Sequence, residues 1–451
     1  MSKNSQLGRL GLFDARVPRY TSYPPATQFR SSVEGLRAAE WIAAVPAGAR
    51  VSLYVHVPFC RRLCWFCACR TQGTSSDAPV AAYVETLLAE IAALRARMAP
   101  GITLSRLHWG GGTPTMLPPA LIARLAGALQ EAFPLAEGAE FSVEIDPSEI
   151  DAPRMEALAA AGMNRASIGV QDFDPLIQEA IGRPQSFELT ATAVRLIRQH
   201  GIASLNTDIL YGLPHQTPAR MSETVQKVLA LSPDRVALYG YAHVPWMSKR
   251  QVMIPDEVLP GGESRLDLFE TAQALFIAEG FDEIGIDHFA RPGDGLARAA
   301  AEGRLRRNFQ GYTDDPSEVL LGLGASSIAR FPQGYAQNAP ATGAYTALVR
   351  AGQVPVTRGH VFTPEDHWRG RMIEMLMCGF RIDMAEIEAR FGIVAARQAA
   401  LFEPLLARFG SALRLREDRL EITPAARPLT RMIAQALDGY AVTAGSHSSA
   451  V

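Results

Sequence analysis

Cysteine is scarce in this sequence, with five residues among 451. A disulfide-stapled protein carries many more cysteines and spreads them along the chain, so that class is excluded. The sequence also has no excess of charge of one sign. It contains 44 lysines and arginines and 46 aspartates and glutamates, which gives a net charge of −2. Without a global positive field we expect no nucleic-acid partner, and any anionic ligand must be met by local arginines.

Long apolar segments are absent as well. The first residues, Met-Ser-Lys-Asn-Ser-Gln-Leu-Gly-Arg, lack the apolar core of a signal peptide, and no later run approaches the length of a membrane span. We therefore expect no membrane span and a cytoplasmic location. Hydrophobic residues make up 48% of the chain and charged residues 20%, which excludes wholesale disorder. A chain of 451 residues predicts one large domain with appendages, or two to three domains.

Short apolar runs alternate with helix-like stretches through the middle of the chain. The runs cover residues 51–57, 104–109, 141–145, 166–170, 205–210, 235–241 and 282–289. The stretches between them cover 79–98, 118–132, 153–161, 187–200, 218–231 and 262–280. Serial strand–helix units favour a parallel sheet with right-handed crossovers, so we predict an α/β fold with a full or partial (β/α) barrel.

Two regions flank this alternation, which lies within residues 51–360. Residues 1–50 contain the restricted, extended stretch Pro18-Arg19-Tyr20-Thr21-Ser22-Tyr23-Pro24-Pro25, so we predict an N-terminal arm laid over the main domain. Beyond residue 360 the pattern becomes helical and closes with a hairpin-like segment at 413–422. This predicts a small, mainly helical C-terminal domain over 361–442 and a frayed tail over 443–451.

Four of the five cysteines, Cys60, Cys64, Cys67 and Cys69, directly follow the first predicted strand. Barrel enzymes keep their chemistry in such loops. The Cys-x3-Cys-x2-Cys spacing can place three thiolates on three corners of a 4Fe-4S cluster and leave the fourth iron open to a small chelating ligand. Zinc is the main alternative, although structural zinc sites usually use two separated knuckles and no second knuckle is present.

Two cysteines, Cys69 and Cys378, lie outside the Cys-x3-Cys-x2-Cys pattern. Cys69 lies just beyond Cys67, so we expect strand or loop geometry to aim its thiol away from the metal site. Cys378 stands alone in the apolar stretch Met375-Leu376-Met377-Cys378, where core packing is the simplest interpretation.

Polar residues recur near the carboxyl ends of the predicted strands. Glu144, Gln171, Arg183 and Asp208 lie at those ends or in the loops after them, and barrel geometry brings such positions to one mouth. Each alone can equally be a cap or a surface charge. Gly110-Gly111-Gly112-Thr113 follows the second strand, where the backbone can approach a ligand closely, with an ordinary glycine turn as the alternative.

Together these motifs resemble the radical S-adenosylmethionine (SAM) superfamily and, within it, the oxygen-independent coproporphyrinogen III oxidases of haem biosynthesis. The cysteine spacing after a first barrel strand carries the first likeness, and the additional Cys69 points to the second. Further motifs extend the resemblance over nearly the whole chain: Pro18-Arg19-Tyr20-Thr21-Ser22-Tyr23-Pro24, Gly110-Gly111-Gly112-Thr113-Pro114-Thr115, Gly169-Val170-Gln171-Asp172-Phe173, Tyr211-Gly212-Leu213-Pro214, Tyr241-Ala242-His243, Asp287-His288-Phe289-Ala290 and Arg307-Asn308-Phe309-Gln310-Gly311-Tyr312-Thr313.

The resemblance implies a partial barrel of the radical SAM type and a set of site residues. Cys60, Cys64 and Cys67 would bind one 4Fe-4S cluster, and Cys69 would be catalytic. Two SAM molecules are implied. The first would be held by Tyr54, Gly111, Glu144 and Ile328, and the second by Gly112, Thr113, Gln171, Arg183, Asp208 and Ala242.

The implied activity is oxidative decarboxylation of two propionate side chains of coproporphyrinogen III to vinyl groups, giving protoporphyrinogen IX. A 5′-deoxyadenosyl radical made from SAM at the cluster would remove a hydrogen from each propionate β-carbon. The reaction needs a one-electron donor and an electron acceptor, neither of which the sequence names, and we expect a monomer. Arg19, Arg306 and Arg307 are candidates for binding substrate carboxylates.

Two alternatives come from other functional classes. A haem-trafficking protein on the same scaffold would bind haem without turnover, but such relatives usually lack the fourth cysteine and the Pro-Arg-Tyr-Thr-Ser-Tyr-Pro arm. A zinc-structured interaction protein would leave the glycine-rich and strand-end motifs unexplained. One local departure from the resemblance is Arg70-Thr71 after Cys69, where some family members have Asn-Lys, and it puts no ligand in doubt.

Overall fold

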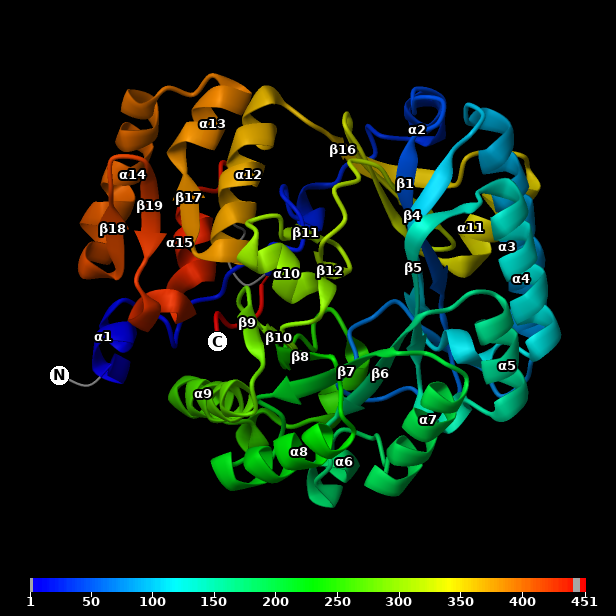
Figure 1. Ribbon diagram of the computed structural model, residues 1–451, viewed down its shortest axis with the longest axis horizontal. Helices are drawn as coiled ribbons and strands as arrows, with labels where there is room; N and C mark the ends of the chain where they lie inside the picture. Colours follow the sequence, from blue (N-terminus) through cyan, green and yellow to red (C-terminus); the bar gives the residue numbers. More distant parts are fainter. Residues whose placement is uncertain (1–2, 441–446) are drawn as a thin grey trace.

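The computed structural model describes residues 3–440 and 447–451, and its centre is an open, mostly parallel sheet wrapped by helices (Figure 1). In order across the sheet, its 12 strands are β16 (Val356–Val361), β15 (Gly334–Asn338), β14 (Ile328–Phe331), β13 (Leu320–Leu323), β1 (Arg50–Val57), β4 (Thr103–Gly111), β5 (Leu135–Ile145), β6 (Arg165–Gln171), β7 (Ser204–Tyr211), β8 (Arg235–Gly240), β10 (His288–Ala290) and β9 (Asp282–Ile284). The seven strands from β13 to β8 pair in parallel. Because β16 and β9 are free ends, the predicted barrel is partial and not closed.

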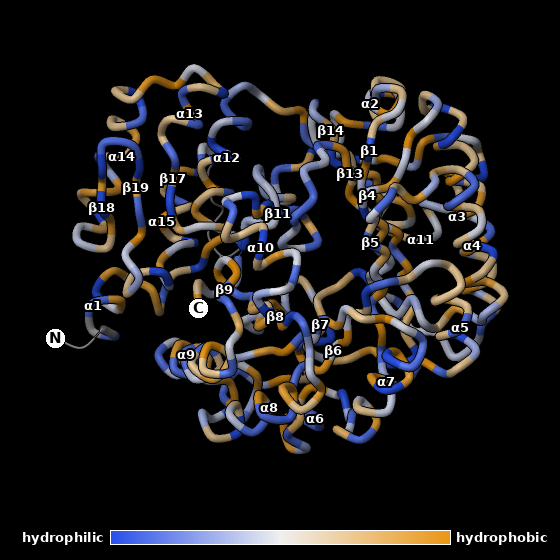
Figure 2. The backbone as a smooth tube through the Cα atoms, in the orientation of Figure 1, coloured by the Kyte–Doolittle hydropathy of each residue, from blue (hydrophilic) through white to orange (hydrophobic). Residues whose placement is uncertain are grey.

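Helices between the parallel strands cover the outer side of the sheet (Figure 1). They are α3 (Ala78–Arg97), α4 (Pro119–Ala132), α5 (Ala152–Ala160), α7 (Phe187–Gln199), α8 (Pro218–Ala230) and α9 (Gly262–Ala278), close to the six predicted stretches. The side chains of Asp151, Ser186 and Thr217 cap the first turns of α5, α7 and α8 by accepting backbone N–H bonds. In Figure 2, hydrophobic and hydrophilic residues alternate along helices such as α7 and α8, as amphipathic helices require.

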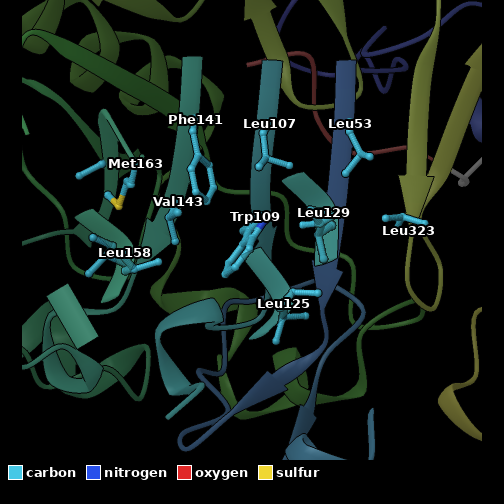
Figure 3. Packing of buried hydrophobic residues seen from close by; sticks show 14 of the residues in the cluster. Leu53, Leu107, Trp109, Leu125, Leu129, Phe141, Val143, Leu158, Met163 and Leu323 are labelled. Atoms are coloured by element: carbon cyan, nitrogen blue, oxygen red, sulfur yellow. The ribbon is translucent and has the colours of Figure 1, made fainter. Parts of the chain in front are cut away.

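Strand alternation separates the core from the site. On β4, Leu107 and Trp109 are almost fully buried and pack with Phe141 of β5 in the apolar layer beneath α4 (Figure 3). His108 lies between Leu107 and Trp109 and therefore faces the opposite, inner side of the curved sheet. The inner side is thus the side on which polar strand residues gather.

The predicted strand at 282–289 is two short strands instead of one. β9 and β10 form an antiparallel pair, and β10 also runs antiparallel to β8. The chain turns at Gly285, whose φ is +57° and whose hypothetical Cβ would collide with the Tyr312 ring. An apolar run alone does not reveal such a turn.

The N-terminal arm is not wholly extended, because it contains α1 (Lys3–Arg9) and α2 (Gly35–Ala43). α2 packs on the core of the sheet through Trp41 and Ile42. The stretch before it contributes Tyr20 and Tyr23 to a second apolar core, which belongs mainly to the C-terminal helices. The arm therefore joins the sheet to the C-terminal region.

The C-terminal region contains the predicted helices and hairpin. Its elements are α12 (Pro364–Gly379), β17 (Arg381–Asp383), α13 (Met384–Phe391), α14 (Ala395–Phe409), β18 (Leu413–Leu415), β19 (Arg419–Ile422) and α15 (Thr430–Ala436). Two further short pairs lie elsewhere: β2 (Phe59–Cys60) with β3 (Gln72–Gly73), and β11 (Arg306–Asn308) with β12 (Gly311–Thr313). No helix in the described ranges combines the length and apolarity needed to cross a membrane.

The prediction of a frayed tail over 443–451 is wrong for its last five residues. Residues 443–446 lie outside the described residues, but 447–451 are packed against the arm. Ser449 bridges to Arg16, the Ala450 N–H donates to Ala15 O at 2.8 Å, and Ala450 and Val451 are buried. Backbone pairing with the arm holds this segment, and a composition rich in serine and alanine does not reveal that pairing.

Glu90 on α3 is a buried carboxylate that joins this helix to the strands after β13. It accepts hydrogen bonds from the Gly324 N–H at 2.8 Å, the Tyr345 hydroxyl at 2.6 Å and the Asn338 amide at 2.7 Å. Burial raises its pKa to about 7, although these hydrogen bonds favour the ionised form. The folded protein therefore binds a proton that the unfolded chain releases at lower pH.

We expect Glu90→Gln to flatten part of the pH dependence of stability. The raised folded-state pKa gives a contribution that is complete below the ordinary value of 4.5 and is lost as pH rises through about 7. Relative to Glu90→Gln, the wild type should lose about 3 kcal/mol of unfolding free energy across that window. Urea unfolding at about pH 5 and pH 8 measures this difference. The exposed Glu85→Gln, on the same helix, is the control, and equal slopes for wild type and Glu90→Gln would contradict the assignment.

Candidate active site

The loop between β1 and α3 carries the four clustered cysteines, Cys60, Cys64, Cys67 and Cys69. Neighbouring loops hold it from two sides. The Trp65 N–H donates to Ile181 O at 2.9 Å, on the segment after β6. The Gln251 amide, on the segment after β8, donates to Phe66 O at 2.7 Å. The loop is therefore fixed over the carboxyl ends of the parallel strands.

Two of the predicted ligand thiols receive hydrogen bonds from outside the loop. The Thr113 hydroxyl donates to Cys60 Sγ at 3.7 Å, and the Arg183 guanidinium donates to Cys64 Sγ at 3.4 Å. Across the described ranges, no three Cys, His, Asp or Glu side chains group closely enough to hold a single metal ion. Three thiols on one loop, two of them facing donors that stabilise negative sulfur, fit a thiolate-bound 4Fe-4S group.

The sequence predicts that the Cys69 thiol points away from the other thiols, but in the structure it lies near Cys67. The two thiols lie close enough to shift each other's pKa, because both residues lie in an irregular loop where strand alternation does not apply. Cys69 is also close to Tyr54 and Glu144: its charge raises the pKa of Tyr54, and the charge of Glu144 raises the pKa of Cys69. It therefore lies between the ligand thiols and the inner side of the sheet.

Glu144, at the end of β5, is the centre of a polar group. It accepts the Gly111 N–H at 2.9 Å and lies 3.3 Å from His108 Nε2. The His108 ring stacks on Tyr54, with ring centroids 5.7 Å apart, and the Tyr54 hydroxyl is 3.0 Å from His56 Nδ1. Burial alone would raise the pKa of Glu144, but His108 and the Gly111 N–H outweigh it and lower this pKa. Glu144 is thus an ionised carboxylate inside the fold.

The glycine-rich turn after β4 allows close backbone packing. Gly111 has a φ of +110°, and a Cβ there would lie 2.5 Å from the His56 ring. At Gly112 a Cβ would collide with the Phe59 carbonyl. The Gly112 N–H donates to Val57 O at 2.8 Å. These glycines bring the turn against β1, directly beside Glu144.

Arg183 and Gln171 lie at the end of β6. The Arg183 guanidinium donates to Gly169 O at 2.9 Å and lies 3.3 Å from Asp146 Oδ2. Gln171 has a φ of +68°, and its amide lies beside Gly169. Arg183 therefore connects the strand end, an acidic partner and the cysteine loop.

Asp208 on β7 is another carboxylate on the inner side of the sheet. It accepts the Asn206 amide at 2.8 Å and the Ser167 hydroxyl at 3.4 Å. Burial raises its pKa to about 6, and the nearby Glu144 acts in the same direction. Asp208 and Glu144 line one cavity of about 230 Å³, together with Tyr239.

The last two predicted residues are placed through their backbones. Ala242 follows β8, and its carbonyl accepts the Gln251 amide at 3.0 Å, which links it to the cysteine loop. Ile328 begins β14 and packs against Gly322, the partner of Tyr54 in the β1–β13 register. The structure thus places all the predicted residues around the carboxyl ends of the sheet, with Glu144 and Asp208 in one cavity.

Some neighbours in the site had not been predicted. His108 joins Tyr54 to Glu144, and Asp146 pairs with Arg183. A signal existed for His108, which interrupts the buried Leu107 and Trp109 at strand spacing. None existed for Asp146, because its partner Arg183 lies far along the chain.

The Arg70-Thr71 departure affects the loop through its backbone. The Arg70 carbonyl lies 3.0 Å from His56 Nε2, so His56 is hydrogen-bonded at both ring nitrogens. The Arg250 guanidinium donates to the Thr71 hydroxyl at 3.0 Å. His56 is thus a buried histidine with both ring nitrogens hydrogen-bonded.

A model of the radical SAM superfamily matches residues 54–228, from β1 into α8. The open parallel sheet, the three-thiol loop and this match define a radical SAM protein.

Full-length relatives narrow the class. The oxygen-independent coproporphyrinogen III oxidase of Paracoccus denitrificans is 66% identical over 451 residues, covering 100% of both chains. The oxidase of the same name from Cereibacter sphaeroides is 58% identical over 98% of both chains. The solved coproporphyrinogen III oxidase of Escherichia coli, a radical SAM enzyme, is 37% identical, with a TM-score of 0.88 over 95% of this chain and 100% of that one. The chain belongs to the oxygen-independent coproporphyrinogen III oxidase family.

Proposed function

We propose that this protein converts two propionate side chains of coproporphyrinogen III to vinyl groups without oxygen, giving protoporphyrinogen IX in haem biosynthesis. The observation that supports this most is the position of Cys69. Its thiol lies close enough to Cys67 and Glu144 to interact with both electrostatically. A radical step needs this proximity of metal site and substrate space.

The 4Fe-4S cluster would be held by Cys60, Cys64 and Cys67. When bound, the cluster and SAM supply a 5′-deoxyadenosyl radical, which removes one β-hydrogen from a propionate before that side chain loses carbon dioxide and one electron. Arg183 and Thr113 would stabilise negative charge on the ligand sulfurs through the hydrogen bonds described above. Glu144 and Asp208 line the same cavity and would face the bound molecules there.

Two SAM molecules are part of this proposal, with the division that the family resemblance implies. Tyr54, Gly111, Glu144 and Ile328 would hold the first, and Gly112, Thr113, Gln171, Arg183, Asp208 and Ala242 the second. Support for the first group is its direct contact, because Gly111 donates to Glu144 and Ile328 packs beside the strand partner of Tyr54. Ionised Glu144 suits an ammonium or hydroxyl donor, and Asp208 suits a ribose hydroxyl.

We further propose a monomer in the cytoplasm that exchanges electrons with a one-electron donor and an acceptor. All the proposed site residues come from one chain and converge on one end of its sheet. The loop thiols are free, as a reducing compartment would keep them. We also propose that the chain is divided into an N-terminal arm (1–50), a catalytic domain (51–360) and a C-terminal domain (361–442).

An anaerobic turnover assay tests the function. Iron-reconstituted protein would be given a reductant, SAM and coproporphyrinogen III, while 5′-deoxyadenosine and porphyrinogen mass are followed together. We expect two successive losses of carbon dioxide and two hydrogens, with 5′-deoxyadenosine formed. Deoxyadenosine with unchanged porphyrinogen would discard the substrate, and neither product from a loaded enzyme would favour the haem-binding alternative.

A further inference from the structure

A second cavity of about 360 Å³ lies between the end of the sheet, the arm and the C-terminal region. Its size is within the range of ligand pockets, roughly 300–1,000 Å³. Tyr239 of β8 lines this cavity and also the cavity that holds Glu144 and Asp208. The two spaces therefore adjoin at Tyr239.

This second cavity, the arginine cavity, has an excess of positive charge. Its lining includes the five arginines Arg19, Arg265, Arg307, Arg427 and Arg431. The carboxylates in the same lining are Glu270, Glu283 and Asp287. Counted over these side chains alone, the formal excess is two positive charges. The carboxylate of Glu283 is paired with Arg427, and Arg265 donates to the main-chain oxygen of Val451, which also lines the cavity, at 2.8 Å.

Three of these arginines donate to backbone oxygens instead of carboxylates. The Arg19 guanidinium donates to Gly240 O, and Arg265 donates to Tyr241 O at 2.8 Å. Arg431 donates to Pro18 O at 3.1 Å and to further backbone oxygens of the arm and the 447–451 segment. A carbonyl satisfies an N–H group but does not neutralise the charge.

Arg307 has donor capacity to spare. Its side chain is 5% exposed, and Nη1 is buried without a hydrogen-bond partner. The nearest Asp287 oxygen is 3.9 Å away and is already 2.7 Å from His288 Nδ1. A buried guanidinium with an unused N–H group is a ready partner for an incoming anion.

Titration of Arg431 agrees with this charge excess. Burial lowers its pKa to about 9, and the nearby Arg19 acts in the same direction. An anion in the arginine cavity would relieve this repulsion.

We propose that the arginine cavity binds the two propionate carboxylates that the reaction leaves intact, with Arg19 and Arg307 as direct partners. The inference rests on the proposed function, since coproporphyrinogen III carries four propionates and only two are converted. Arginine forks match carboxylates in a bidentate manner. The neighbouring cavity beyond Tyr239 would then receive the edge of the ring that carries the reacting propionates.

The charge change of the reaction explains the choice of the retained propionates. A reacting carboxylate leaves as neutral carbon dioxide, so an arginine that stabilises its negative charge would hold the ground state more tightly than the transition state. A retained carboxylate stays ionised throughout, and its binding positions the ring at no such cost. Strong arginine binding therefore belongs on the propionates that remain.

Porphyrin binding without turnover tests the inference. The probes are coproporphyrin III, with four propionates, and mesoporphyrin IX, which keeps only the two retained ones, titrated by fluorescence quenching of the full chain without reductant. We expect Arg307→Gln and Arg19→Gln each to weaken both porphyrins by a similar factor, about 10- to 100-fold. Arg304→Gln is the matched control, because Arg304 lies three residues from Arg307 but its exposed guanidinium is paired with Glu302 and does not line the cavity, and it should change affinity by less than about 2-fold.

Each outcome separates the inference from the proposed function. Weaker coproporphyrin binding with unchanged mesoporphyrin binding would place the reacting propionates in the arginine cavity and overturn the inference. Unchanged binding of both would show that these arginines do not hold carboxylates. A wild type that binds neither porphyrin would overturn the proposed substrate as well. If Arg307→Gln fails to fold, the binding data for Arg19→Gln, a partly exposed residue of the arm, test the inference alone.

Discussion

Protein carrying Cys64→Ala should be purified without its iron–sulfur group. Cys64 is buried at 6% exposure, and its sulfur receives the Arg183 hydrogen bond, so alanine at this position leaves a guanidinium facing the space where the thiolate was. With two loop ligands left, we expect iron and sulfide contents and the visible charge-transfer absorption to fall to background. Formation of 5′-deoxyadenosine should fall to background with them.

Cys378→Ser is the matched control for the loss of a cysteine. Cys378 ends α12, far along the chain from the loop, and packs beside an apolar group that includes Leu305 and Tyr312. This variant should keep the full iron content, with at most a modest loss of stability from a buried hydroxyl. Full iron in Cys64→Ala, or loss of iron in Cys378→Ser, would show that the loop is not the metal site.

Local periodicity explains why so much of the sheet was predictable. Residues 104–109 alternate apolar side chains with Arg106 and His108, and the structure places β4 there, with the helical 118–132 stretch following as α4. The antiparallel extension was not predictable in the same way. β15 has the sequence Gly-Tyr-Ala-Gln-Asn, and its buried Asn338 is tolerated because distant Glu90 and Gly324 accept its amide hydrogen bonds.

The site shows the same division between local and distant information. Cysteine spacing predicts a metal site because all the ligands lie on one loop, and strand-end carboxylates converge because parallel strands end together. The arginine cavity has no such local pattern. Arg19, Arg265 and Arg431 lie hundreds of residues apart and meet only because the arm and the 447–451 segment pack between the sheet and α15. Single arginines in a sequence read as surface charges.

Cys69→Ser should leave the metal site intact and remove vinyl formation. Cys69 is not among the three proposed ligands, but its thiol contacts Cys67 and lies beside Tyr54 and Glu144. A group at this position can deliver or accept a hydrogen or proton at the substrate, whereas a serine hydroxyl is a far poorer donor for a carbon radical. We expect normal iron content and a fall of about 100- to 10,000-fold in vinyl formation.

This prediction is tested by measuring 5′-deoxyadenosine and the vinyl product in the same reaction. If Cys69 acts after radical formation, the variant should still form 5′-deoxyadenosine from SAM while the mass of the porphyrinogen stays unchanged. A merely structural role would lower both products together, because a displaced Cys67 would disturb the cluster first. The iron content and visible spectrum of the same sample separate these cases. Full vinyl formation by Cys69→Ser would remove Cys69 from the mechanism and leave its contact with Cys67 as loop packing only.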